Sequence, residues 1–124
     1  MKVISTDKAP AAIGPYSQGI VSNGMLFSSG QIPIIPETGA IAEGDIEVQA
    51  HQAIKNVGQI LKAAGVSYAD VVKTSCFLAN MDDFAKFNSV YEQYFTGKPA
   101  RSCVAVKTLP KNVLCEVEVI AEVH

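Results

Sequence analysis

Residues 113–123 read VLCEVEVIAEV, an alternating segment near the end of the 124-residue chain. Successive side chains of a β-strand point to opposite faces of its sheet. One face of this strand carries only apolar side chains: Cys115, Val117, Val119, Ala121 and Val123. The other face mixes apolar with acidic side chains: Leu114, Glu116, Glu118, Ile120 and Glu122. The pattern predicts a strand whose first face is covered by helices, while its second face is either solvated or covered by another copy of the chain.

Two segments upstream have the periodicity of helices that pack on such a sheet. The first runs from Asp45, a predicted N-cap, to Gly65, a predicted C′ residue. Its apolar residues recur at three- and four-residue steps: Ile46, Ala50, Ala53, Ile54, Val57, Ile60, Leu61 and Ala64. The second has Asp82 and Asp83 in its first turn, where carboxylates complement the helix dipole, and Gly97 ends it. Its inner face is an aromatic stripe that we interpret as core: Phe84, Phe87, Tyr91, Tyr94 and Phe95.

The remaining apolar runs predict strands around these helices. Asn23-Gly24 is a strong hairpin signal between strands at 16–21 and 25–29. A β-branched run at 71–78 and a shorter run at 102–106 indicate two more strands. The predicted order is β-β-α-β-α-β-β, an α+β two-layer sandwich with one mixed sheet and two helices on one face. The length suits a single domain spanning residues 1–124.

The composition disfavours several classes of protein: nucleic-acid-binding, membrane-spanning and secreted proteins. The formal net charge of -2 and the scattered basic residues give no reason to expect a nucleic-acid partner. No apolar run reaches the length of a membrane span, and residues 1–8 lack the apolar region of a signal peptide. Three cysteines, Cys76, Cys103 and Cys115, lie inside strand-like runs at unrelated spacings, which is typical of reduced, packed thiols. We therefore expect a cytoplasmic protein.

Arg101 and Glu116 are the charged residues with the clearest potential for chemistry. Arg101 follows Pro99-Ala100 at the start of a strand-like run, and its planar guanidinium suits two-point contact with a carboxylate. If residues 107–112 form a hairpin, the strand of Glu116 returns beside the strand of Arg101. The alternative is an ordinary cross-strand ion pair worth about 0.2–1 kcal/mol.

Several common catalytic arrangements are missing from the sequence. The two histidines are His51, expected at the solvated boundary of a helix, and His124 at the end of the chain. Neither provides a base near Ser102 or Cys103. Zinc-ligand spacing, EF-hand, P-loop and dinucleotide motifs are absent. The remaining groups fit chemistry on a small carboxylic acid without a metal or cofactor, with an arginine for the carboxylate and a glutamate for a proton or a water.

Four motifs carry a resemblance to a known family. They are AAIGPY at 11–16, SGQIP at 29–33, PARSCV at 99–104, and LPK at 109–111 followed by EVE at 116–118. Their order and spacing resemble the RidA (YjgF-type) family of enamine/imine deaminases over nearly the whole chain. The resemblance implies a chorismate-mutase-like fold and a homotrimer with ligand sites between subunits. It also implies cofactor-free hydrolysis of 2-aminoacrylate, as its 2-imino acid tautomer, to a 2-oxo acid and ammonia.

The resemblance also assigns roles to individual residues. Arg101 would hold the substrate carboxylate, and Glu116 would orient or activate the attacking water. Gly30 and Cys103 would contribute main-chain contacts, and three side chains would line the cleft: Tyr16, Ser29 and Asn88. One departure from the family pattern is the short connection Thr96-Gly97-Lys98, which would shorten one wall of the cleft.

Two other functions remain open on the sequence. The first is a non-catalytic module that binds 2-oxo acids or other small carboxylates, because a catalytic glutamate and a ligand-binding glutamate look alike. The second is a ribonuclease or translation inhibitor. The acidic balance and the lack of a histidine pair argue against the second function.

Overall fold

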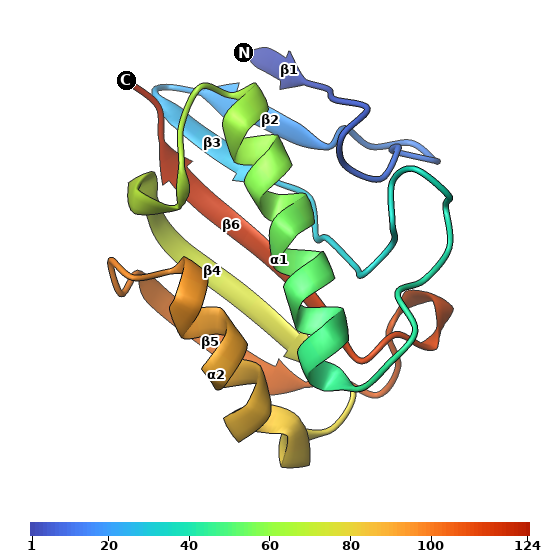
Figure 1. Ribbon diagram of the computed structural model, residues 1–124. Coiled ribbons are helices and arrows are strands. Elements are labelled where there is room, and N and C mark those ends of the chain that lie inside the picture. The colour runs from blue at the N-terminus through green and yellow to red at the C-terminus, as the bar shows by residue number, and fades with distance from the viewer.

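Six strands form one mixed sheet, and two helices lie across one of its faces in the computed structural model, which describes residues 1–124 (Figure 1). The elements follow in the order β1 (Lys2–Ile4), β2 (Gly19–Ser22), β3 (Met25–Ser28), α1 (Ile46–Ala63), β4 (Val71–Leu78), α2 (Phe84–Tyr94), β5 (Ala100–Ala105) and β6 (Cys115–Glu122). The α+β sandwich predicted from the sequence is confirmed. Strand β1 was not predicted, because three residues are too few to show a period.

The helix ends follow the predicted capping signals closely. The Asp45 carboxylate accepts a hydrogen bond from Val48 N at 3.1 Å, and Gly65 has the left-handed φ of +80° expected just after a helix. The start of α2 differs from the prediction, because residues 81–83 form a short 3-10 turn and the α-helix begins at Phe84. The Asn80 side chain caps that turn by accepting from Asp82 N.

The strand order differs from the expected one and affects the site directly. The sheet runs β1-β2-β3-β6-β4-β5, with β4 parallel to β5 and antiparallel to β6. The hairpin interpretation of residues 107–112 is therefore wrong, because β4 separates β5 from β6. The crossover through α2 makes β5 a parallel edge strand. The chain then returns through the turn Pro110–Asn112, where Lys111 and Asn112 have φ values of 56° and 55°.

Apolar packing between helices and sheet forms the core. The inner side chains of β6 are all buried, as their alternation predicted: Cys115, Val117, Val119 and Ala121. They contact the buried stripe of α1, which includes Ile54, Val57, Ile60 and Leu61. In α2, Phe87 and Tyr91 are buried, and Phe95 is buried just beyond the helix end. The aromatic stripe is thus largely core, as the sequence indicated.

The second face of the sheet has no covering layer within the chain (Figure 1). Apolar side chains lie there at the surface, with Phe27 47% exposed and Val104 48% exposed. Leu114 and Ile120 of the β6 region are half-buried on this face. Neither helix combines the length and apolar character needed to cross a membrane.

Candidate functional site

Four of the predicted site residues meet in one cavity of about 360 Å³. This Glu116 cavity lies where β3 ends, beside the first half of β6. The predicted residues that line it are Tyr16, Ser29, Gly30 and Glu116. Its other lining residues are Pro10, Ala11, Gln18, Gln31, Ile32, Ile34 and Pro110. The structure therefore brings together the N-terminal loop, the SGQIP motif and the catalytic glutamate candidate.

Gly30 provides the space that the Glu116 carboxylate occupies. A Cβ placed on Gly30 would overlap the Oε2 atom of Glu116, so the carboxylate lies directly against the Gly30 backbone. Paired hydrogen bonds between the main chains of Gln31 and Val117, at 2.8 and 3.0 Å, fix this alignment. A glycine is required here for space, because any side chain would displace the carboxylate.

Hydrogen bonds within the chain hold the rim of the Glu116 cavity. Ser29 donates its hydroxyl to Ser17 O at 2.6 Å and its N–H to Gln18 O at 2.9 Å. The buried Gln18 amide ties down the N-terminal loop, accepting from Thr6 N at 2.7 Å and donating to Pro10 O at 2.8 Å. The Gly30 N–H donates to no acceptor within the chain. Gly30 therefore offers a main-chain donor beside the Glu116 carboxylate.

Burial changes the proton affinity of Glu116. Loss of solvation raises the pKa of its carboxyl above the ordinary value, and the neighbouring charge of Glu118 raises it further. A carboxylate with a raised pKa is a better proton acceptor near neutral pH than an ordinary surface glutamate. The electrostatics of this cavity therefore suit general acid/base chemistry.

The Arg101 side chain lies in a second hollow, of about 370 Å³, at the edge of the sheet. This Arg101 hollow is lined by Asn88, Tyr91, Glu92, Phe95, Lys98, Pro99 and Arg101. Arg101 Nη1 donates to Asn88 Oδ1 at 2.6 Å. The guanidinium carbon lies 4.8 Å from the ring centre of Tyr91 and 5.3 Å from that of Phe84. Asn88, predicted as a lining residue, lines this hollow and also orients the arginine.

Strand register shows that the two pockets open on opposite faces of the sheet. Thr74 of β4 faces Arg101 across one strand boundary and Val119 across the other. All three side chains therefore point toward the helices, since paired residues share a face. Glu116 lies an odd number of residues from Val119 and points to the uncovered face. The expected proximity of Arg101 and Glu116 within one chain is wrong.

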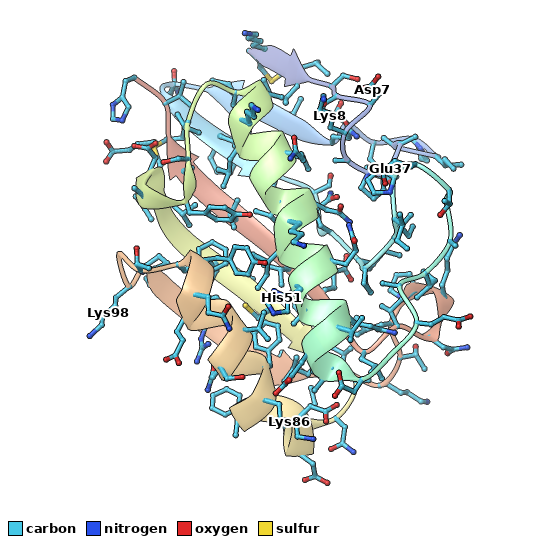
Figure 2. The ribbon with its side chains drawn as sticks, viewed as in Figure 1. Asp7, Lys8, Glu37, His51, Lys86 and Lys98 are labelled. Carbon is cyan, nitrogen blue, oxygen red and sulfur yellow. The ribbon has the colours of Figure 1, made fainter.

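Cys103 is partly buried in the fold, and each histidine contacts a side chain outside the two pockets. Cys103 lies on the helix-covered face two residues after Arg101, and burial raises the pKa of its thiol. His51 is a residue of α1 (Figure 2), and its Nδ1 is 2.7 Å from the hydroxyl of Tyr94 in α2. His124 pairs with Asp70 at 2.9 Å. The side-chain partners of the two histidines are therefore Tyr94 and Asp70.

Sequence reasoning missed three contributors to these pockets. Tyr91 and Phe84 were assigned to the core, although both rings also contact the Arg101 guanidinium. Gln31 is 5% exposed and lines the Glu116 cavity, with its amide nitrogen 3.3 Å from Ser29 O. An aromatic stripe looks the same in sequence whether or not an arginine lies against it. The SGQIP motif could have indicated Gln31, because it directly follows Gly30.

Known proteins resemble this chain over its whole length. The family model described as Endoribonuclease L-PSP matches residues 6–123. The "Putative regulator AldR" of Lactococcus lactis is 54% identical over 124 residues, covering 99% of this chain and 98% of that protein. The 2-iminobutanoate/2-iminopropanoate deaminase of Salmonella typhimurium is 51% identical over 124 residues, covering 97% and 96%. The structure of Escherichia coli TdcF with bound serine superimposes with a TM-score of 0.94 at 46% identity, covering 98% of each chain. The chain belongs to this Endoribonuclease L-PSP family, which is the RidA (YjgF-type) family.

Proposed function

We propose that the protein hydrolyses 2-imino acids, the tautomers of 2-aminoacrylate and related enamines, to 2-oxo acids and ammonia. The observation that carries the proposal is the Glu116 carboxylate, held against Gly30 in a cavity that raises its pKa. The name of the Salmonella relative supports the reaction. No cofactor enters the proposal, because an imine carbon is already electrophilic.

The opposite orientations of Arg101 and Glu116 support a site shared between two copies of the chain. One copy supplies Arg101, Asn88 and the Cys103 main chain. Its neighbour supplies Glu116 with Gly30, Ser29 and Tyr16. We propose a closed homotrimer, in which the uncovered sheet face with Phe27, Leu114 and Ile120 packs against other subunits.

The proposed reaction needs positioning and one proton relay. Arg101 binds the substrate carboxylate through two parallel N–H donors, which fixes the imine carbon. Glu116 accepts a proton from a water as the water oxygen bonds to that carbon, and returns it to the imine nitrogen, giving a tetrahedral amino alcohol. Glu116 then takes the hydroxyl proton of the amino alcohol and passes it to the nitrogen as the C–N bond breaks and the C=O bond forms, so the products are ammonia and the 2-oxo acid.

A second candidate function is binding of 2-oxo acids or other small carboxylates without turnover. The name of the AldR relative favours a regulatory role for that protein. The TdcF structure with bound serine shows that a relative holds a small molecule carrying a carboxylate. Both candidates use Arg101 in the same way and differ only in what Glu116 does.

RNA cleavage is the function that the family description names, and we do not expect it here. His51 and His124 have separate partners, Tyr94 and Asp70. The formal net charge of -2 also disfavours a polyanionic substrate.

Ammonia release from freshly generated 2-aminoacrylate tests the proposal against the binding alternative. We expect the wild-type protein to accelerate release of ammonia and 2-oxo acid in stoichiometric amounts. Calorimetric binding of 2-oxobutanoate would be measured on the same sample. Saturable binding with no acceleration of hydrolysis would reject the deaminase and favour the binding module. Light scattering that shows a stable monomer at micromolar concentration would reject the shared site.

A further inference from the structure

One face of α2 forms a cradle for the Arg101 side chain. Phe84, Asn88 and Tyr91 follow one another at steps of four and three residues, so they lie along one stripe of the helix. Two of them place aromatic rings against the guanidinium and the third accepts a hydrogen bond from Nη1. The residues that orient the Arg101 side chain therefore belong to α2 and not to its own strand, β5.

Tyr91 is the member of this cradle that is tied to the core. It is 8% exposed, and its hydroxyl lies 2.8 Å from Oγ1 of Thr74, which is fully buried. Its ring packs on Phe95 with ring centres 4.6 Å apart. Burial raises the pKa of Tyr91, which keeps the phenol neutral and able to share a hydrogen bond with Thr74.

Thr74 is connected to Arg101 in two ways, through the strand backbone and through the Tyr91 side chain. It is the register partner of Arg101 on the neighbouring parallel strand β4. It also anchors the phenol whose ring lies against the guanidinium. The contacts Thr74–Tyr91–Arg101 and Thr74–Arg101 thus form a closed loop between β4, β5 and α2.

An anchored ring matters because Arg101 is on an edge strand and has a long, flexible side chain. Two-point binding of a carboxylate needs one orientation of the guanidinium plane. An arginine side chain has many rotamers, and ordering them on binding lowers the affinity. Contact with an aromatic face reduces that freedom before a ligand arrives.

We infer that Tyr91 is a positioning residue, which Thr74 anchors and which holds the Arg101 guanidinium in the plane that a carboxylate requires. The inference rests on the proposed function and adds a residue that acts only through Arg101. The hydroxyl contact with Thr74 and the packing on Phe95 together fix the ring, and the ring fixes the arginine.

Four substitutions test these roles. Tyr91→Leu removes the ring, while Tyr91→Phe keeps the ring and its packing on Phe95. Phe87→Leu is the matched control, because Phe87 is a buried aromatic of the same helix whose ring centre lies 6.0 Å from that of Tyr91 and which makes no cation–π contact with the guanidinium. Tyr91→Met is made in parallel, since flexible methionine fills irregular gaps if leucine prevents folding.

Kinetics and ligand binding provide the first readout. We expect Tyr91→Leu or Tyr91→Met to raise KM, and the Kd for 2-oxobutanoate, about tenfold, which equals about 1.4 kcal/mol. Turnover should change less than KM, because carboxylate binding stabilises ground and transition states alike. Tyr91→Phe should restore both constants to within about twofold of wild type. Phe87→Leu should lower Tm without changing either constant.

Side-chain NMR of ¹⁵N-arginine provides a readout that needs no activity. The Arg101 Nε–Hε signal, identified by its loss in Arg101→Lys, should shift when the ring is removed and stay in place in Tyr91→Phe. Unchanged signal and unchanged affinity in Tyr91→Leu and Tyr91→Met would overturn the inference. Equal losses in Tyr91→Leu and Phe87→Leu would overturn it too. Absence of deamination in wild type would reject the proposed function alone, because binding and NMR still test Tyr91.

Discussion

The Glu116 cavity and the Arg101 hollow are built from different kinds of contact. Main-chain hydrogen bonds fix the Glu116 cavity, through the Gln31–Val117 pair and the glycine that makes room for the carboxylate. Side-chain contacts fix the Arg101 hollow, where rings of α2 lie against a guanidinium on an edge strand. The first arrangement suits a proton acceptor that must not move. The second suits a long, flexible charged side chain that must be held in one orientation on an edge strand.

Glu116→Gln is expected to give the largest effect, because it removes the proton acceptor and keeps size and hydrogen bonding. We predict a fall in turnover of about 10²–10⁴-fold with a much smaller change in 2-oxo acid affinity. Since the pKa of Glu116 is raised, wild-type turnover should decline on the acid side from a higher pH than an ordinary glutamate would give. Steady-state kinetics across pH would measure both effects.

Glu118→Gln is the matched control, because Glu118 lies two residues along the same face of β6. It should leave turnover nearly unchanged. Stability gives a further check. A raised pKa in the folded state makes the free energy of unfolding fall as pH rises through the range between the unfolded and folded pKa values. Glu116→Gln should therefore be no less stable than wild type above that range. Equal, small kinetic effects at both positions would leave Glu116 without a catalytic role.

Mixing two inactive variants tests whether the pockets combine between copies. Arg101→Ala and Glu116→Gln should each be nearly inactive alone. Co-expressed, they should form mixed trimers in which about a quarter of the inter-subunit sites carry both native groups. Activity per chain should then recover toward about a quarter of wild type. No recovery in trimers shown by mass spectrometry to be mixed would contradict a shared site.

Gly30→Ala changes the Glu116 cavity without changing a charge. The new methyl group would displace the carboxylate, and such a misplacement can cost about 10²-fold in turnover. Stability should change little, because the displaced atoms are the flexible end of a side chain. Gly97→Ala is the control, since a Cβ there meets nothing within 4 Å. Kinetics and thermal unfolding of both variants would measure this difference, and full activity in Gly30→Ala would contradict the close packing.

Cys103→Ala should give the smallest effect. We expect most activity to remain, because Cys103 would act through its main chain and burial raises the pKa of its thiol. The same kinetic assay measures it, with circular dichroism to confirm folding. A folded but inactive variant would point to covalent catalysis by the thiol.

Local features of the fold could be read from the sequence, and pairing between distant strands could not. The alternation of β6 and the caps Asp45 and Gly65 are short-range signals, and each is confirmed. The order of β4, β5 and β6 depends on the crossover through α2, for which residues 107–112 carry no local signal. The hairpin prediction therefore failed there.

The same difference between short-range signals and long-range pairing explains which parts of the site could be predicted from the sequence. Motifs close in sequence, such as Ser29-Gly30, meet as expected in the Glu116 cavity. The face on which Arg101 lies depends on its register with Thr74, which the sequence around Arg101 does not reveal. Tyr91 could be identified as buried, but its contact with Arg101 follows only from the packing of α2 on β5.

The opposite orientation of Arg101 and Glu116 on one sheet has a genetic consequence in the proposed ring of subunits. A copy altered only at Arg101 would spoil one site, and so would a copy altered only at Glu116. A copy altered at both positions would spoil the site on each of its two sides, leaving a single working site in a ring with two normal partners. Expressed beside a normal allele, the doubly altered allele would therefore remove more activity than an allele that carries either single change.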